Sequence, residues 1–166
     1  MALKPDRDFD CSYNMGYFWA ANGQAPAEEG GIAGVVSAGS GVALDDPGSS
    51  GIAPGKGGVN TVDYVADPSG VQAVGLLLHA IEAEPVTSFK RKNYHTNAQW
   101  PGDPVSLLRR GWVVTDQIIG TPAAGSGAFL GASGQLSTSQ AASAPQVGRF
   151  ETTKDADGFA RVFLDI

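Results

Sequence analysis

The sequence has almost no cysteine and very little histidine. Cys11 is the only cysteine among 166 residues, so no intrachain disulfide can form and a zinc site built from several cysteines is excluded. One free thiol is compatible with assembly in a reducing cytoplasm. His79 and His95 do not form an HExxH or HxH pair, and a zinc site would need distant carboxylates. We expect both histidines to be surface or strand-packing residues.

Charged residues are scarce, and basic residues are the scarcer kind. Charged side chains make up 17% of the chain, with 11 Lys and Arg against 17 Asp and Glu, for a net charge of −6. A nucleic-acid binder needs clustered Lys and Arg to contact phosphates, so we predict no nucleic-acid partner. The short basic segments Lys90-Arg91-Lys92 and Arg109-Arg110 are interpreted either as solvated charge on strand faces or as a local docking patch.

Long apolar runs are absent as well. The best candidate, residues 74–81, is interrupted by Gly75 and His79 and is far too short to span a bilayer. Aspartates within residues 6–10 stand where a signal peptide would need an apolar core. We therefore expect a soluble protein that is not secreted and has no membrane partner.

Glycine and proline, in contrast, are abundant, with 23 and 10 residues. They separate short apolar runs, a pattern that favours strands and turns over long helices. A chain of this length forms on average one domain, which buries roughly two thirds of its unfolded surface. We predict a mainly β fold with one domain body, residues 30–166, preceded by a segment of different character, residues 1–29.

Residues 159–166 show the clearest strand pattern. One face carries apolar side chains and the other carries charges: Ala160, Val162, Leu164 and Ile166 against Arg161 and Asp165. Side chains alternate across a strand, so this pattern predicts a half-buried strand. The turn cluster 154–158 precedes it, and residues 146–152 are rich in Val, Phe and Thr. We predict a terminal β-hairpin.

Further strands are predicted from the same kind of pattern, at residues 32–36, 59–66, 105–109, 112–119, 128–130 and 135–138, with a charged strand at 85–95. Arg110-Gly111 is interpreted as the break between two of them. Residues 69–84 are ambiguous, because they fit a helix that begins at Ser69 and also a strand. Gly75 weakens the helix by about 1 kcal/mol relative to Ala, and the strand is favoured.

The N-terminal segment gathers aromatic residues without a regular period: Phe9, Tyr13, Tyr17, Phe18 and Trp19. Disordered tails are usually poor in aromatics. Two interpretations remain open at this point. The segment wraps on its own domain, or it is an arm that anchors its aromatics on a neighbouring subunit or a partner.

Motifs for catalysis or cofactor binding are incomplete. Gly55-Lys56-Gly57 lacks the spacing and the Ser or Thr of a P-loop, and residues 125–131 miss the dinucleotide-binding spacing. Asp155-Ala156-Asp157-Gly158 resembles the start of a calcium loop but lacks its later ligands, and a hairpin turn explains the same residues. No Gly-x-Ser-x-Gly elbow occurs. We predict no catalytic residues, no cofactor and no metal.

One resemblance emerges from the order of turn and strand motifs. These are residues 104–111, Trp112-Val113-Val114-Thr115, Ala128-Phe129-Leu130-Gly131, Ser133-Gly134, Val147-Gly148-Arg149-Phe150 and the stretch from Lys154 to Ile166. This order resembles the C-terminal half of the capsid decoration, or cement, proteins of tailed bacteriophages. The upstream motifs Asp67-Pro68-Ser69-Gly70 and Val74-Gly75-Leu76-Leu77-Leu78 resemble that group too.

The resemblance implies a single β-barrel or β-sandwich body, jelly-roll or tulip-like, with an extended N-terminal arm. It implies a structural, non-enzymatic protein on the outer surface of the virion capsid, made in the host bacterial cytoplasm. Its partners would be the major capsid protein and its own copies, as a homo-oligomer, with a trimer favoured and a dimer as the other option. Two alternatives stay open: a carbohydrate-binding module or head fibre that stacks Trp100, Trp112 or the N-terminal aromatics on sugar rings, and a small hydrolase.

Overall fold

The computed structural model describes residues 12–20, 23–37, 60–83 and 99–166, which form strands and turns. The strands are β1 (Ser12–Trp19), β2 (Ile32–Ser37), β3 (Asn60–Asp63), β4 (Ala73–Leu77), β5 (Pro104–Thr115), β6 (Ile118–Ile119), β7 (Gly127–Leu130), β8 (Leu136–Ser137), β9 (Gln146–Phe150) and β10 (Ala160–Asp165). A 3-10 turn, η1 (Ala132–Gly134), is the sole helical element of these ranges. The prediction of a mainly β fold is confirmed. Within the same ranges, no helix is long and apolar enough to cross a membrane.

The first five strands close into a barrel. Their order is β1-β3-β2-β4-β5, and β1 also pairs with β5, which completes the ring. The β1–β3 pair is parallel, and the other pairs of the ring are antiparallel. Closure leaves no open sheet edge in the ring. Of the predicted architectures, the barrel is therefore the one observed, and we call this part the barrel lobe (β1–β4 and residues 104–110 of β5).

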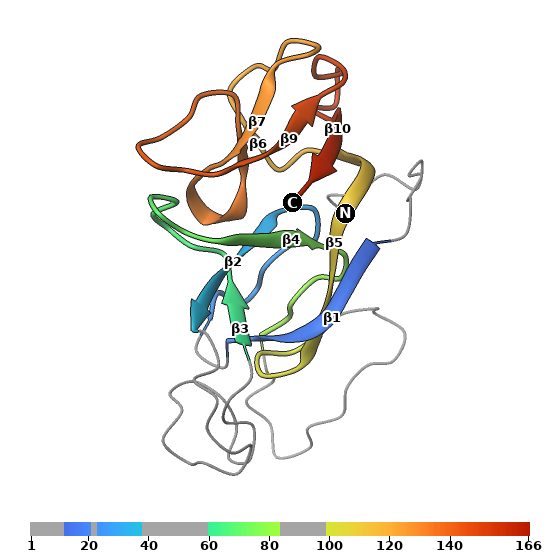
Figure 1. Cartoon of the computed structure of the whole chain (residues 1–166). Helices are drawn as coiled ribbons and strands as arrows, with labels where there is room; N and C mark the ends of the chain where they lie inside the picture. The colour runs from blue at the N-terminus through green and yellow to red at the C-terminus, as the bar shows by residue number, and fades with distance from the viewer. Residues whose placement is uncertain (1–11, 21–22, 38–59, 84–98) are drawn as a thin grey trace.

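The sheet then continues from β5 into a second layer. The upper part of β5 pairs with β10, and the order runs on through β9, β7, β8 and β6. We call residues 111–166 the outer lobe. Figure 1 shows the two lobes one above the other, with β5 running through both. One long strand thus couples the barrel to the outer sheet.

The prediction of two strands separated at Arg110-Gly111 was wrong. β5 continues through this position, where Gly111 adopts φ +143. Glycine tolerates such a conformation because it has no Cβ, so the strand changes course without ending. The strand ends instead at Thr115, and residues 118–119 form the separate short strand β6.

Two hydrophobic cores share the strands β2, β4 and β5. Ile32 and Leu76 belong to the core that fills the outer lobe, while the next residue of each strand, Ala33 and Leu77, belongs to the barrel core. These strands are therefore buried on both faces, and such strands read as continuous apolar runs. This explains why residues 69–84 were ambiguous in the sequence. The favoured strand is observed as β4.

The predicted terminal hairpin is confirmed as the antiparallel pair β9–β10. Val162 and Leu164 are fully buried, and Arg161 and Asp165 are exposed, as the alternation predicted. The turn before β10 is held by Asp155, whose Oδ1 accepts hydrogen bonds from the backbone N–H groups of Asp157 (3.0 Å) and Phe159 (2.9 Å). The carboxylate of Asp155 thus has a structural role in the hairpin.

Candidate functional site

The N-terminal aromatics are placed differently from one another. The Trp19 side chain is fully buried in the barrel core, where its Nε1 donates a hydrogen bond to the Gln24 carbonyl (3.0 Å) and its ring meets Tyr64 edge-on at 5.2 Å. A side chain with no exposed area cannot contact another protein. The expectation for Trp19 is corrected: it stabilises its own barrel.

For the other N-terminal aromatic residues, contact with a partner remains a prediction. Tyr17 and Phe18 are half-buried on β1, and Tyr17 packs against the barrel core. Tyr13 lies on the same strand, opposite Leu108 of β5. Phe9, like the predicted strand at 85–95, lies outside the described residues. The part of the predicted arm from Ser12 to Trp19 is thus a strand of the barrel.

Tyr64 links the two lobes. Its hydroxyl donates to the Glu28 carbonyl (2.5 Å) and accepts from the Gly31 N–H (3.1 Å). A Cβ added to Gly134 would lie 2.4 Å from the Tyr64 ring, so the outer-lobe turn η1 packs directly on it. Burial raises the pKa of Tyr64, with smaller contributions from nearby carboxylates, and the phenol stays neutral.

Asp63 anchors the neighbouring turn of the barrel. Its carboxylate accepts hydrogen bonds from the backbone N–H groups of Gln24 (2.9 and 3.0 Å) and Tyr64 (2.7 Å). Burial raises the pKa of Asp63, and these two hydrogen bonds partly oppose the shift. The carboxylate satisfies backbone donors of two residues, so it has the surroundings of a structural residue.

A polar cleft of about 270 Å³ lies where the lobes meet. It is lined by Gln24, Pro26, Glu28, Tyr64, Gln117, Ser133 and Gln135. The Gln117 amide donates to the Glu28 carboxylate across the cleft (3.1 Å). Among the described residues that line the cleft, Glu28 is the one carboxylate, so these residues do not assemble the pair of acids that a glycosidase requires.

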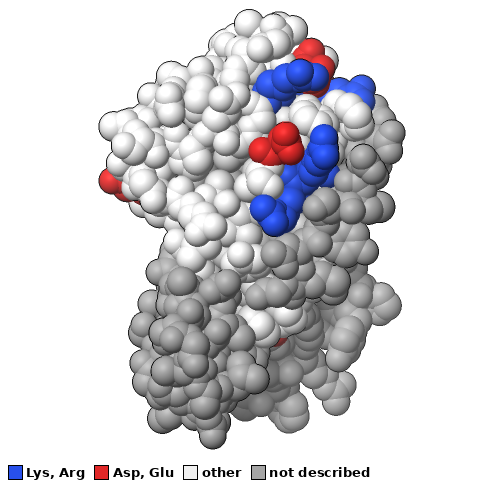
Figure 2. Space-filling model, viewed as in Figure 1, with Lys and Arg blue, Asp and Glu red and all other residues white. Residues whose placement is uncertain are grey.

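An uncharged surface covers much of the outer lobe. No Asp, Glu, Lys or Arg occurs between Asp116 and Arg149. Apart from Ile119 of β6, the exposed positions of this stretch lie mainly in three loops, within residues 120–125, 132–133 and 139–143, which carry small or amide side chains. Figure 2 shows the result as a broad white area on the upper part of the molecule. We call these loops the uncharged loops.

The outward face of β5, β10 and β9 is different, because it combines arginines with aromatic rings. Trp112 lies opposite Phe163, with ring centroids 5.0 Å apart. Arg161 lies over Trp112 (5.7 Å) and Arg149 over Phe163 (5.6 Å), while Arg110 faces Asp165 (3.7 Å). We call these six residues the arginine–aromatic face; Figure 2 shows basic and acidic residues gathered on this side of the outer lobe.

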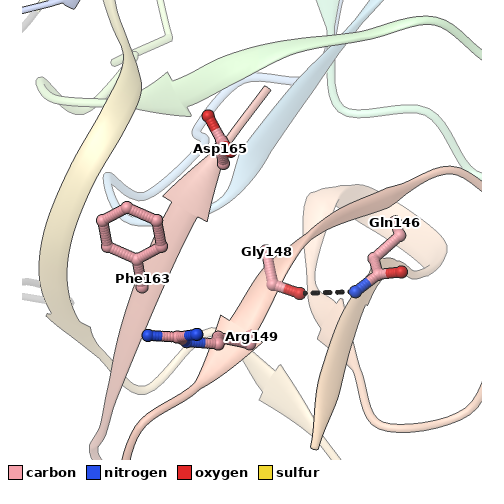
Figure 3. Close-up of a pocket in the computed structure, with 5 residues that line it drawn as sticks. All are labelled: Gln146, Gly148, Arg149, Phe163 and Asp165. Atoms are coloured by element: carbon pink, nitrogen blue, oxygen red, sulfur yellow. Dashed lines mark hydrogen bonds between the residues drawn. The ribbon is translucent and has the colours of Figure 1, made fainter.

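A pocket of about 360 Å³ opens on the arginine–aromatic face. Its lining residues come from β9 and β10: Gln146, Gly148, Arg149, Phe163 and Asp165. Figure 3 shows Arg149 and Phe163 facing each other from the two strands, with Asp165 further along β10. The Gln146 amide nitrogen donates to the Gly148 carbonyl (3.1 Å), which leaves Gln146 Oε1 as an acceptor. The pocket therefore offers both donors and acceptors beside a ring.

The described residues contain no group of His, Cys, Asp and Glu side chains close enough together to hold a metal ion. His79 is half-buried two residues after β4, and His95 lies outside the described ranges. No protein-family model matches the chain, and no curated protein matches its sequence.

Two surface features were not predicted from the sequence, although the sequence contains a pattern that corresponds to each. The uncharged loops correspond to the long interval without any charged residue. The arginine–aromatic face follows from the alternation already noted in β10, because Phe163 lies between Arg161 and Asp165 on the outward face. The pairing of Phe163 with Arg149 depended on the β9–β10 register, which the sequence did not specify.

Proposed function

We propose that this protein is a structural component of a bacteriophage virion that binds the outer surface of the head and bridges major capsid protein subunits. The observation that carries the proposal is the surface of uncharged loops on a closed β scaffold. The motif order that resembles capsid decoration proteins supports the same role. In this role the protein needs no catalytic group and no cofactor.

The uncharged loops suit docking on a protein shell for two physical reasons. Burying an unpaired charge is costly, and these loops have none to bury. Gly, Ala and Pro lose little or no side-chain entropy when they are fixed, and the loops consist largely of these residues and Ser. Each contact can be weak, because an assembly of several copies engages several sites at high effective concentration.

The proposed assembly is a homo-oligomer that matches the symmetry of the capsid lattice, with a trimer favoured over a dimer. Closed symmetry is the usual state of protein oligomers. The protein would be made in the host cytoplasm and would remain on the outside of the capsid.

The test is binding to parent heads that lack this protein, measured by co-sedimentation. Ala124→Glu and Ala142→Glu place a charge in two of the uncharged loops, and Ala83→Glu makes the same change at an exposed position that follows β4 and lies outside these loops. We expect each loop variant to weaken binding by at least about tenfold, because the new carboxylate must be desolvated. The Ala83 variant should bind as the unmodified protein does. Equal binding by all variants would show that the loops do not dock.

The N-terminal prediction requires a separate variant. Deletion of residues 1–20 would remove β1 and open the barrel, so it cannot separate docking from folding. Deletion of residues 1–11 keeps β1. If Phe9 and its neighbours contact the capsid, this variant should fold, as judged by circular dichroism, and bind heads more weakly. Unchanged binding would rule out a contact by residues 1–11.

Carbohydrate recognition has less support. Trp100 lies in the turn that precedes β5, where the Asp103 backbone N–H donates to the Trp100 carbonyl (3.0 Å), whereas Trp112 lies well along the strand, roughly 27 Å from its start at Pro104. The Trp112 ring already packs against Phe163 and Arg161. Neither arrangement provides the shared open platform on which the two rings would stack a sugar chain.

A further inference from the structure

We propose that the pocket between β9 and β10 binds an acidic peptide segment of a partner protein, with a carboxylate of that segment on the guanidinium of Arg149. This site is distinct from the uncharged loops, and its existence does not depend on capsid attachment. If the capsid role is correct, the segment belongs to the major capsid protein.

Arg149 is held in position by two neighbours. Its Nε donates to the Glu151 carboxylate at 2.6 Å, and its guanidinium lies over the Phe163 ring at 5.6 Å. A guanidinium carries five N–H donors in a planar fork, and only the Nε–H is used in the bond to Glu151. The side chain remains 61% exposed. Arg149 is therefore an oriented donor at the solvent boundary, which is the arrangement that favours two-point binding of a carboxylate.

The charge of this face complements an acidic partner. The protein carries a net charge of −6, yet Arg110, Arg149 and Arg161 all lie on this one face. The acidic side chains among them are engaged: Glu151 with Arg149 and Asp165 with Arg110. A negatively charged segment approaching this side meets a locally positive surface, whereas other parts of the molecule repel it.

The other lining groups favour a peptide over a simple anion. Asp165 and the Oε1 atom of Gln146 are acceptors on the pocket wall. A free carboxylate would meet the Asp165 charge with nothing to donate to it, and inorganic phosphate brings up to about two negative charges, which its O–H donors only partly offset. An extended peptide presents backbone N–H groups beside its acidic side chain, so it can satisfy Asp165 and Gln146 while its carboxylate reaches Arg149.

A sugar fits the pocket less well. Stacking of a sugar requires an open aromatic face, and the Phe163 ring has Arg149 over it and Trp112 packed beside it. Displacing Arg149 would also break its bond to Glu151. The same contacts that make the ring a poor sugar platform hold the arginine in place for an anion.

The experiment is a nuclear magnetic resonance titration of the intact chain with a blocked peptide, acetyl-Gly-Glu-Gly-Glu-Gly-amide. The matched control is the same peptide with Gln in place of Glu. We expect saturable shifts of the Arg149 Nε–H and of the Gly148 and Phe163 amides with the Glu peptide, and binding at least about tenfold weaker with the Gln peptide. Inorganic phosphate should shift these signals much less at the same concentration.

Three variants locate the contact. Arg149→Gln should weaken peptide binding by more than about tenfold, and Arg149→Lys should also weaken it severalfold because a lysine keeps the charge but loses the planar fork. Arg161→Gln removes a charge from the same face outside the pocket and should change binding by no more than about twofold. Unchanged spectra elsewhere verify the fold of each variant.

Several results would overturn the proposal. Equal binding of the Glu and Gln peptides would show that no carboxylate is recognised, and equal binding of phosphate would make this a general anion site. Saturable shifts of the Phe163 signals by a neutral oligosaccharide, without shifts by the Glu peptide, would assign the pocket to sugars. The absence of saturable shifts with any probe would show that the pocket is not a binding site.

Discussion

Trp19 of the barrel lobe and Trp112 of the outer lobe are placed in opposite ways, although the outer lobe also buries an aromatic ring, Phe150, in its core. In the barrel, Trp19 and Tyr64 are buried and packed edge-to-face, with their polar atoms hydrogen-bonded to backbone groups. In the outer lobe, Trp112 and Phe163 lie on the outward face, where an arginine guanidinium lies over each ring. The first arrangement fills a core and the second positions charge at the surface. Trp19 thus stabilises the barrel, whereas Trp112 and Phe163 lie beneath arginines at the surface of a lobe that has its own apolar core.

The sharpest test of this comparison is to remove one tryptophan from each lobe. Trp19→Ala should lower the free energy of unfolding by about 3–5 kcal/mol, because it empties a fully buried site in the barrel. Trp112→Ala removes a half-buried ring from a surface face and should cost about 1 kcal/mol. Denaturant unfolding measures both values. Similar losses for the two variants would mean that the outward aromatics are part of the stabilising core.

Two substitutions on β10 test which face of this outer-lobe strand is buried. Leu164 is fully buried on β10, and Leu164→Ala should cost about 2–5 kcal/mol. Arg161 is exposed on the opposite face of the same strand, and Arg161→Ala should cost well under about 1 kcal/mol. If the two substitutions had equal effects in the same assay, the assignment of the buried face of β10 would be incorrect.

The two lobes should nevertheless unfold together. β2 and β4 contribute side chains to both cores, so neither core can be disrupted without exposing the other. We expect Leu164→Ala to shift one cooperative transition, with fluorescence and circular dichroism giving the same midpoint. Two separate transitions would show that the barrel lobe survives loss of the outer lobe.

Tyr64→Phe tests the contact between the lobes with a smaller change. The variant keeps the ring against Gly134 but removes the hydroxyl, which leaves the Glu28 carbonyl and the Gly31 N–H without their partner. Unsatisfied buried groups of this kind cost about 1–3 kcal/mol. The midpoint of thermal unfolding should fall accordingly. A neutral result would indicate that water replaces the hydroxyl at this junction.

The sequence predicted those parts of the fold in which one face is buried and the other is solvated. The alternation in residues 159–166 identified β10, its inward face and the hairpin with β9. The prediction was weaker for β4, because a strand buried on both faces has no alternation to detect. It failed at Arg110-Gly111, since a glycine inside a long strand gives the same signal as a glycine in a turn.

The surfaces were harder to predict, because they depend on which strands become neighbours. β1 joins the barrel through pairing with β5, across about 90 residues of sequence, and the N-terminal aromatics carry no local pattern that specifies it. The sequence therefore left open whether Trp19 belongs to a docking arm or to its own domain, and the structure places it in the barrel core. Similarly, Arg149 and Phe163 are each unremarkable in the sequence, and only the register of β9 and β10 places them together.

The smallest predicted effect concerns Asp63, the carboxylate that anchors the barrel turn at Gln24. Burial raises its folded-state pKa above the ordinary value of 3.8, so ionisation costs more in the folded state than in the unfolded state. Stability contributed by the neutral form is present below pH 3.8 and is lost as the pH rises through the folded-state pKa. The unfolding free energy of the unmodified protein minus that of Asp63→Asn should therefore be larger below pH 3.8 than at pH 7.

Between low pH and pH 7, this difference in unfolding free energy should change by less than about 1 kcal/mol, since Asp63 is only partly buried and solvent screens its charge. The direct measurement is the carbon-13 chemical shift of the Asp63 carboxyl group as a function of pH, which should give a pKa above 3.8. A lower pKa, or a difference between the two proteins that grows toward pH 7 in favour of the unmodified protein, would mean that the hydrogen bonds from Gln24 and Tyr64 outweigh burial. The carboxylate would then stabilise the barrel turn by its charge. In the outer lobe, Asp165 and Glu151 are instead paired with arginines at the surface, so the two lobes would also differ in the partners of their carboxylates.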